Sequence, residues 1–361
     1  MRQSLKVMVS STVALLFMAN PAAASEEKKE YLIVVEPEEV SAQSVEESYD
    51  VDVIHEFEEI PVIHAELTKK ELKKLKKDPN VKAIEENAEV TISQTVPWGI
   101  SFINTQQAHN RGIFGNGARV AVLDTGIASH PDLRIAGGAS FISSEPSYHD
   151  NNGHGTHVAG TIAALNNSIG VLGVAPSADL YAVKVLDRNG SGSLASVAQG
   201  IEWAINNNMH IINMSLGSTS GSSTLELAVN RANNAGILLV GAAGNTGRQG
   251  VNYPARYSGV MAAAAVDQNG QRASFSTYGP EIEISAPGVN INSTYTGNRY
   301  ESLSGTSMAT PHVAGVAALV KSRYPSYTNN QIRQRINQTA TYLGSPSLYG
   351  NGLVHAGRAT Q

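Results

Sequence analysis

The run Arg119-Val-Ala-Val-Leu-Asp-Thr-Gly126 places four apolar or small residues directly before an aspartate. A short apolar run of this kind, bounded by turn residues, is typical of a buried strand of a parallel sheet. Three similar runs follow along the chain, at 180–185, 211–214 and 237–240. Helical patterns lie between and after them, over 154–165, 193–207, 223–235, 307–324 and 329–339. This alternation predicts an α/β fold built on a parallel sheet.

The loops that follow these predicted strands carry most of the chemically interesting residues. Asp124 ends the first strand, a Gly/Ser loop follows the second, Ser215-Leu216-Gly217 follows the third, and Gly244-Asn245 follows the fourth. In an open α/β sheet, ligands bind beyond the carboxyl ends of the strands. We therefore expect these loops to meet at one functional site.

Charge divides the chain into unlike segments. Residues 25–93 carry 19 acidic side chains against nine Lys, a net charge of -10, whereas residues 94–361 carry 12 acidic against 15 basic side chains, a net charge of +3. This asymmetry suggests that the acidic segment complements the larger one electrostatically, although a merely solvated acidic domain is the alternative. No basic run stands out after residue 93, so we expect no nucleic-acid partner.

The N-terminal residues 1–24 have the pattern of a secretory signal. Arg2 and Lys6 precede a mostly apolar run over 7–19, and Ala22-Ala23-Ala24 supplies small residues for cleavage. A membrane anchor is the alternative, but the apolar run is too short to span a bilayer. We therefore expect a secreted, extracellular protein without a membrane partner. Nothing in the sequence indicates oligomers, so we expect a monomer.

The absence of cysteine excludes thiol catalysis, thiolate metal sites and disulfides. Residues 94–361 do not need disulfides for stability, because 268 residues suffice for one large core. Residues 25–93 read as a small α+β unit with strands near 31–35, 51–57, 81–84 and 90–92 and a helix near 41–49. Thr68 and Glu71 form a capping box that opens a second helix, which ends before Asp78.

Asp124, His154 and Ser307 supply an acid, a base and a nucleophile. A serine hydroxyl needs a histidine to take its proton, and that histidine needs a carboxylate to orient it. Asp124-Thr-Gly126 alone also fits an aspartic protease, but no second copy exists. His154 and His157 could hold zinc, but the glutamate of the zinc motif is missing. Ser307 could simply cap a helix.

Three longer motifs carry a family resemblance: Val122-Leu-Asp-Thr-Gly126, His154-Gly-Thr-His-Val-Ala-Gly160 and Gly305-Thr-Ser-Met-Ala-Thr-Pro-His312. With them the chain closely resembles the subtilisins, secreted serine endopeptidases, and above all their high-alkaline branch. The resemblance implies a three-layer parallel-sheet catalytic domain over 94–361. It also implies a signal over 1–24 and a ferredoxin-like α+β propeptide over 25–93 that acts as inhibitor and folding chaperone. Maturation would cut either 92–93 or 93–94.

The resemblance assigns roles to the residues that match the family's motifs. The triad would be Asp124, His154 and Ser307, with Asn245 as side-chain donor of the oxyanion hole, while His157 would be structural. A protein or peptide substrate would pair with two edges and enter one side-chain pocket. These substrate-binding residues are Gly190, Ser191, Gly192, Ser215, Leu216, Gly217, Ala242, Gly244 and Asn252. Asn252 stands where relatives often have Gly or Ser, so we expect a shallower pocket that favours medium-sized side chains.

Calcium enters through the resemblance alone. The matching oxygen ligands would come from Gln94, Asp132, Leu165, Asn167, Ile169 and Val171, and a hard cation such as Ca²⁺ prefers six or more oxygens. Without the family, 165–170 reads as an ordinary polar turn. A second cation site near Ala255 stays open. So does the role of Glu301, which either tunes preference for basic substrates or is a solvated charge.

Two other classes of protein compete with the endopeptidase. A catalytically inert protein with this fold could capture peptides without cutting them, and labelling by a serine-reactive phosphonate would separate it from an enzyme. An esterase or lipase is opposed by the order of the triad, which in α/β-hydrolases runs Ser, acid, His.

Overall fold

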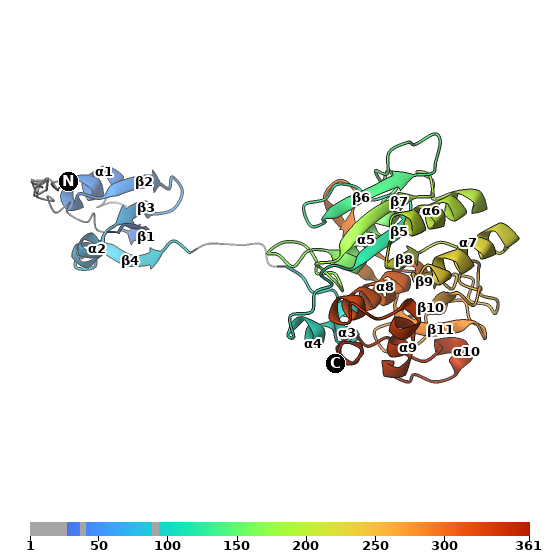
Figure 1. Ribbon diagram of the computed structural model, residues 1–361. Helices are drawn as coiled ribbons and strands as arrows, with labels where there is room; N and C mark the ends of the chain where they lie inside the picture. The colour runs from blue at the N-terminus through green and yellow to red at the C-terminus, as the bar shows by residue number, and fades with distance from the viewer. Residues whose placement is uncertain (1–26, 37–40, 89–93) are drawn as a thin grey trace, which may run out of the picture. The chain divides into compact units, whose positions relative to one another are not determined.

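The computed structural model describes residues 27–36, 41–88 and 94–361. They belong to two compact units, residues 1–90 and 91–361 (Figure 1). The predicted secretory signal, the strand predicted at 90–92, and Ser93 of both candidate maturation bonds lie outside the described residues.

The smaller unit is an α+β fold with one antiparallel sheet. Its sheet order is β2-β3-β1-β4, and the chain order of strands and helices is that of a ferredoxin-like fold. The elements are β1 (Lys29–Val35), α1 (Ala42–Tyr49), β2 (Asp52–Glu56), β3 (Val62–Leu67), α2 (Lys69–Leu75) and β4 (Val81–Glu86). Capping boxes at Ser41 and Thr68 open the two helices, which confirms the predicted helix starts.

Strand β3, an inner strand of the small sheet, is absent from the sequence-based prediction. Its side chains alternate between buried and half-buried positions, with Ile63, Ala65 and Leu67 facing the core. Polar His64 and Glu66 interrupt the apolar run, so the strand lacks the continuous apolar signal used for the others.

The larger unit is built on a seven-stranded sheet in which every neighbouring pair is parallel. The order is β11-β10-β9-β8-β5-β7-β6. These strands are β5 (Arg119–Asp124), β6 (Ile135–Ser140), β7 (Asp179–Lys184), β8 (Ile211–Met214), β9 (Leu238–Ala242), β10 (Val260–Val266) and β11 (Ile282–Pro287). The predicted parallel sheet is thus confirmed, and β6, β10 and β11 extend it.

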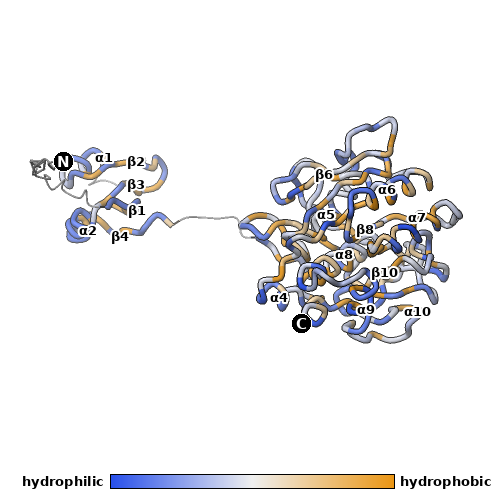
Figure 2. The backbone as a smooth tube through the Cα atoms, in the orientation of Figure 1, coloured by the Kyte–Doolittle hydropathy of each residue, from blue (hydrophilic) through white to orange (hydrophobic). Residues whose placement is uncertain are grey.

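Helices cover both faces of this sheet, which gives three layers (Figure 1). Successive residues of β5 point to opposite faces: Val120 and Val122 pack with α5 (His154–Ala163) and α8 (Thr306–Arg323). Ala121 and Leu123 pack with α6 (Leu194–Asn206) and α7 (Ser223–Asn234). Strands β9 and β10 are buried along their whole length and hold only apolar or small residues, whereas the edge strand β6 is half-buried; Figure 2 colours apolar segments orange.

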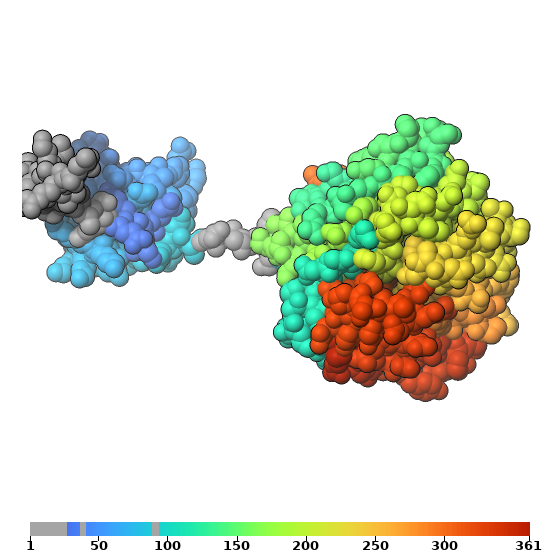
Figure 3. All heavy atoms as spheres, viewed as in Figure 1, coloured from blue at the N-terminus to red at the C-terminus, as the bar shows by residue number. Residues whose placement is uncertain are grey.

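Helix α8 is the central helix of one face. Residues Met308 to Val320 are all buried, so this part of the helix is surrounded by protein on every side. The remaining elements are α3 (Trp98–Phe102), α4 (Thr105–His109), β12 (Ile291–Tyr295), β13 (Arg299–Leu303), α9 (Asn329–Thr339), α10 (Pro346–Tyr349) and α11 (Ala356–Ala359). Strands β12 and β13 form an antiparallel hairpin that packs on α5, and the C-terminal residues cover the lower part of the face seen in Figure 3.

Candidate active site

Asp124 is the last residue of β5, and its side chain is fully buried. Its Oδ1 accepts the Thr125 backbone N–H at 2.7 Å and lies 2.7 Å from Nδ1 of His154. Among the described residues, Oδ2 has no hydrogen-bond partner. A buried carboxylate with so few partners favours a positively charged neighbour, so Asp124 is placed to stabilise an imidazolium at His154.

His154 begins α5 and keeps 28% of its side chain exposed. The preceding Gly153 has a φ of +113°, and a side chain there would collide with Tyr295, so only glycine fits this turn. Burial is the largest influence on the pKa of His154 and lowers it. The charge and hydrogen bond of Asp124, together with the charge of Asp150, outweigh burial and raise the pKa above its ordinary value.

Asp150 is a buried carboxylate that organises the turn before α5. Its Oδ1 accepts hydrogen bonds from the Thr125 hydroxyl and from the backbone N–H groups of Asn152 and Gly153, all at 2.9 Å. Its Oδ2 accepts from the backbone and hydroxyl of Thr156. One side chain therefore joins the end of β5 to the first turn of α5, and so sets where His154 meets Asp124.

His157, one turn further along α5, has different partners. Its side chain is fully buried, and its Nε2 donates to the carbonyls of Ile291 and Glu301 at 2.9 and 3.1 Å. Burial lowers its pKa to about 4, so the ring is neutral. The two imidazoles therefore face different groups: His154 faces Asp124, and His157 links α5 to the β12–β13 hairpin.

Ser307 lies at the start of α8 and is tied to Ser215 by two hydrogen bonds. The Ser307 hydroxyl donates to the Ser215 carbonyl at 3.0 Å, and the Ser215 hydroxyl donates to the Ser307 carbonyl at 2.8 Å. The second bond is available because Pro311, four residues on, has no N–H to fill that carbonyl. In this arrangement the Ser307 hydrogen points at Ser215, so a group that takes over the Ser215 carbonyl would free it.

Asn245 lies beyond the end of β9 and beside Ser307. Its Oδ1 accepts from the backbone N–H and the hydroxyl of Thr306, at 2.9 and 3.0 Å. Because these bonds use the amide oxygen, the Nδ2 donor remains for another partner. Asn245 and Ser307 line the same cavity of about 350 Å³, together with Leu216, Gly217, Ala242, Gly244, Thr246, Asn252 and Thr306.

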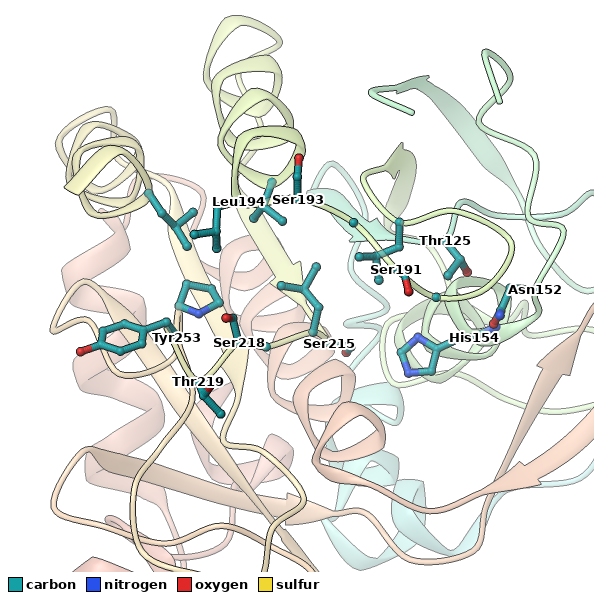
Figure 4. A pocket seen from close by; sticks show the side chains of 18 residues that line it. Thr125, Asn152, His154, Ser191, Ser193, Leu194, Ser215, Ser218, Thr219 and Tyr253 are labelled. Atoms are coloured by element: carbon teal, nitrogen blue, oxygen red, sulfur yellow. The ribbon is translucent and has the colours of Figure 1, made fainter. Parts of the chain in front are cut away.

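A longer groove of about 620 Å³ adjoins this cavity, since Leu216 and Gly217 line both. Figure 4 shows His154 and Thr125 at one end, Ser215 between, and Tyr253 and Thr219 at the other end. Gly190, Ser191 and Gly192 line it as well. All nine predicted substrate-binding residues thus line one of two adjoining hollows, beyond the carboxyl ends of β5, β7, β8 and β9.

Comparison with known proteins shows the family of the chain. The subtilase family (Peptidase S8) matches residues 115–352, and the peptidase inhibitor I9 family matches residues 18–93. The chain belongs to the subtilase family. A thermostable alkaline protease of Halalkalibacterium halodurans is 99% identical over the full length of both chains, and an alkaline protease of Shouchella clausii is 57% identical, also over all of both. Subtilisin Savinase of Lederbergia lenta is 65% identical over 74% of this chain and all of its own.

The subtilase is therefore a serine endopeptidase of the subtilisin type, preceded by an inhibitor-type propeptide. The predicted fold class and enzyme class are both confirmed. No helix within the described ranges is long and apolar enough to cross a membrane.

Asn252 closes one side of the 350 Å³ cavity of the subtilase. A Cβ built on Gly217 would lie 3.1 Å from the Cβ of Asn252, and one on Gly244 would lie 2.9 Å from its Nδ2. The amide side chain therefore fills space between two glycines. Glu301 lines neither hollow: it lies on β13 with 45% of its side chain exposed and 4.0 Å from Arg299, as a solvated charge would.

Six predicted calcium ligands of the subtilase lie together. The carbonyls of Leu165, Ile169 and Val171 converge on the Gln94 side-chain amide, whose Nε2 lies 2.5, 3.3 and 3.1 Å from them. Asn167 Oδ1 lies 3.4 Å from the same nitrogen, and Asn167 Nδ2 donates to Asp132. If the Gln94 side-chain amide is flipped, its Oε1 takes the place of Nε2 and every ligand atom of the set is an oxygen. Such a set fits a hard cation. In the described part of the chain no three His, Asp or Glu side chains gather to hold a metal.

The sequence analysis did not single out three residues that shape this site. Asp150 and Thr306 support His154 and Asn245, and the third, Lys184, is a fully buried lysine at the end of β7. Lys184 had a detectable signal, because it is one of only two lysines after residue 93 and it ends an apolar strand. Asp150 had none, because the bond that joins it to the end of β5 comes from Thr125, 25 positions earlier in the chain.

Proposed function

We propose that the subtilase cleaves peptide bonds through an acyl-enzyme on Ser307. His154 takes the Ser307 proton and later gives it to the leaving amine, while Asp124 holds the ring in the right tautomer and stabilises its cation. The observation that carries this proposal is the 2.7 Å contact between His154 and Asp124, at the groove that continues into the cavity of Ser307. The raised pKa of His154 supports its role as a base.

The oxyanion that forms on the substrate carbonyl needs donors already in place. Asn245 Nδ2 is left free by the two bonds that Thr306 makes to Oδ1, and the backbone N–H of Ser307 lies at the first turn of α8. The positive end of the helix dipole adds to these donors. We assign Asn245 and the Ser307 N–H as the oxyanion hole.

An extended substrate would add a strand between 190–192 and 215–217. Main-chain pairing tolerates many sequences, so specificity is broad. A substrate that uses the Ser215 carbonyl would also release the Ser307 hydroxyl toward His154. Asn252 narrows the side-chain pocket, so medium-sized residues such as Leu, Met and Ala are favoured. A strong preference for Phe or Tyr in a series of p-nitroanilide substrates would refute this.

The protein would be made as a precursor with a signal over 1–24, a propeptide over 25–93 and a mature enzyme over 94–361. The mature enzyme would be secreted and act as a monomer. It would bind Ca²⁺ at Gln94 and the 165–171 loop. The match of the I9 inhibitor family to 18–93 supports inhibition by the propeptide before release. The converging oxygens around Gln94 support the cation site.

The decisive test is the intact mass and N-terminal sequence of the protein secreted by a host without other proteases. The parent should be trimmed near Ser93, and Ser307→Ala should stay untrimmed. Ser304→Ala is the matched control, because its hydroxyl bonds to Asn290 and not to the site, and it should mature like the parent. Trimming of Ser307→Ala would show that another protease matures the chain. Covalent labelling of the parent by a serine-reactive phosphonate checks Ser307 independently.

A further inference from the structure

Lys184 is a fully buried cation that the proposed mechanism does not use. It is the last residue of β7, and its Nζ donates to the carbonyls of Thr125 and Leu186 at 2.7 and 2.9 Å. The same Nζ lies 3.1 Å from Oε2 of Glu145, whose side chain is only 6% exposed. Thr125 follows the proposed catalytic acid, and Leu186 begins the loop that leads to Gly190. One ammonium group therefore joins these two segments.

Glu145 carries the link further along the substrate loop. Its Oε1 accepts from the backbone N–H of Arg188 at 2.9 Å, and its Oε2 accepts from Asn151 at 3.2 Å. The Arg188 bond is the largest of the influences that hold the pKa of Glu145 down to about 2, so the carboxylate stays charged at any working pH. On the other side of Arg188, its carbonyl accepts from the Asn152 side chain at 2.9 Å.

These contacts fix both peptide groups of Arg188, two residues before Gly190. Asn152 also accepts the backbone N–H of His154 at 3.1 Å, so the segment that carries the base takes part. An apolar pair could fill the same space, but it would leave the carbonyls of Thr125 and Leu186 and the N–H of Arg188 without these partners. The charged pair is therefore suited to holding Thr125, Leu186 and Arg188 at fixed positions relative to one another.

We propose that Lys184 and Glu145 are positioning residues that hold the 186–192 loop at the distance from Asp124 and His154 at which an extended substrate can pair with it. The inference rests on the proposed pairing of substrate with 190–192. It predicts that the pair matters for substrates long enough to reach this loop, and little for substrates that occupy only the Ser307 cavity.

The test compares an acetylated tetrapeptide p-nitroanilide with an acetylated single-residue ester that has the same terminal residue. Lys184→Met keeps the length of the side chain and removes the ammonium, and Glu145→Gln keeps the size and removes the charge. Rates are expressed per active site, titrated with a phosphonate. We expect KM for the tetrapeptide to rise about tenfold in both variants, as weakening of one or two main-chain hydrogen bonds would cause. Ester kcat/KM should stay within about twofold, since its contacts are unchanged.

Glu283→Gln is the matched control. Glu283 is another poorly exposed carboxylate, paired with Arg333 and Asn337, and it lines neither hollow. It should lower the thermal midpoint without changing the ratio of tetrapeptide to ester activity. Asn151→Ala, at an exposed position, removes one bond to Glu145 and should raise tetrapeptide KM in the same direction by about twofold. The Asn151→Ala variant can still be measured if the Lys184 and Glu145 variants fail to mature.

Equal loss of tetrapeptide and ester activity per active site would overturn the positioning role, and so would an unchanged KM for the tetrapeptide. Either result would leave the pair as a stabiliser of the fold. The parent enzyme tests the underlying assumption separately. If its kcat/KM does not rise from a single-residue p-nitroanilide to the tetrapeptide p-nitroanilide, pairing with 190–192 is itself wrong.

Discussion

Single residues in this enzyme act through groups that their neighbours leave free. Thr306 occupies the amide oxygen of Asn245, so its amide nitrogen remains a donor, and Pro311 frees the Ser307 carbonyl for Ser215. In both cases a residue outside the proposed triad decides which atom of a site residue is left for another partner. Two predictions belong to this scale.

Asn245→Leu removes the proposed oxyanion donor. We expect kcat to fall by about 100- to 1000-fold with KM nearly unchanged, a magnitude known from another subtilisin and not calculated from this geometry. Asn245→Asp is the companion variant, because a carboxylate still accepts both Thr306 bonds but offers no donor. Steady-state kinetics per titrated site measure both, and a normal kcat in either variant would remove Asn245 from the mechanism.

Asp150→Asn removes a negative charge that raises the pKa of His154. His154 must be neutral to act as a base, so activity is lost as pH falls through its pKa. A lower pKa therefore moves the acid limb of the kcat/KM profile to lower pH. Asp124 itself is unchanged in this variant, and His157 is already neutral. Asp267→Asn, in a remote turn, should leave the limb in place. A limb that stays put or moves to higher pH in Asp150→Asn would contradict the assignment.

At the scale of elements, the site is assembled from the ends of strands and the starts of helices. The ends of β5, β7, β8 and β9 supply Asp124 and the loops, and α5 and α8 begin at or beside His154 and Ser307. Parallel strands place all their carboxyl ends at one edge, so residues more than 100 positions apart meet there. The 165–171 loop after α5 is different, because Gln94, Thr95 and Asp132 hold it in place.

Calcium should therefore stabilise this loop. In mature enzyme blocked at Ser307 by a phosphonate to prevent autolysis, excess Ca²⁺ over chelator should raise the melting midpoint by several degrees. The basis is that a ligand at 100 times its Kd adds about 2.7 kcal/mol to the stability of the folded state. Asn167→Ala should lose most of this gain, and Asn269→Ala, in a turn elsewhere, should keep it. Identical midpoints in Ca²⁺ and chelator would argue against the site.

At the scale of the whole molecule, the two parts of the precursor have net charges of opposite sign. Residues 25–93 have a net charge of -10 and residues 94–361 a net charge of +3. If attraction between them helps inhibition, salt should weaken it, because the screening length falls from about 10 Å at 0.1 M to about 3 Å at 1 M. We expect Ki of added 25–93 against the mature enzyme to rise with ionic strength. KM for a neutral peptide measured in parallel is the control, and a constant Ki would show that apolar contacts dominate.

The sequence by itself determined the parallel α/β fold, the main helices and the three residues of the proposed triad, because buried strands are continuous apolar runs and the motifs around Asp124, His154 and Ser307 are long. It missed β3, whose polar residues alternate with buried ones. Only the tertiary structure decided that Asp150 bonds to Thr125, that Ser215 and Ser307 bond to each other, and that Lys184 and Glu145 join the 186–192 loop to Thr125. Those contacts join segments far apart in the chain, and a buried polar residue is defined by its partners in space, which no local pattern of residues records.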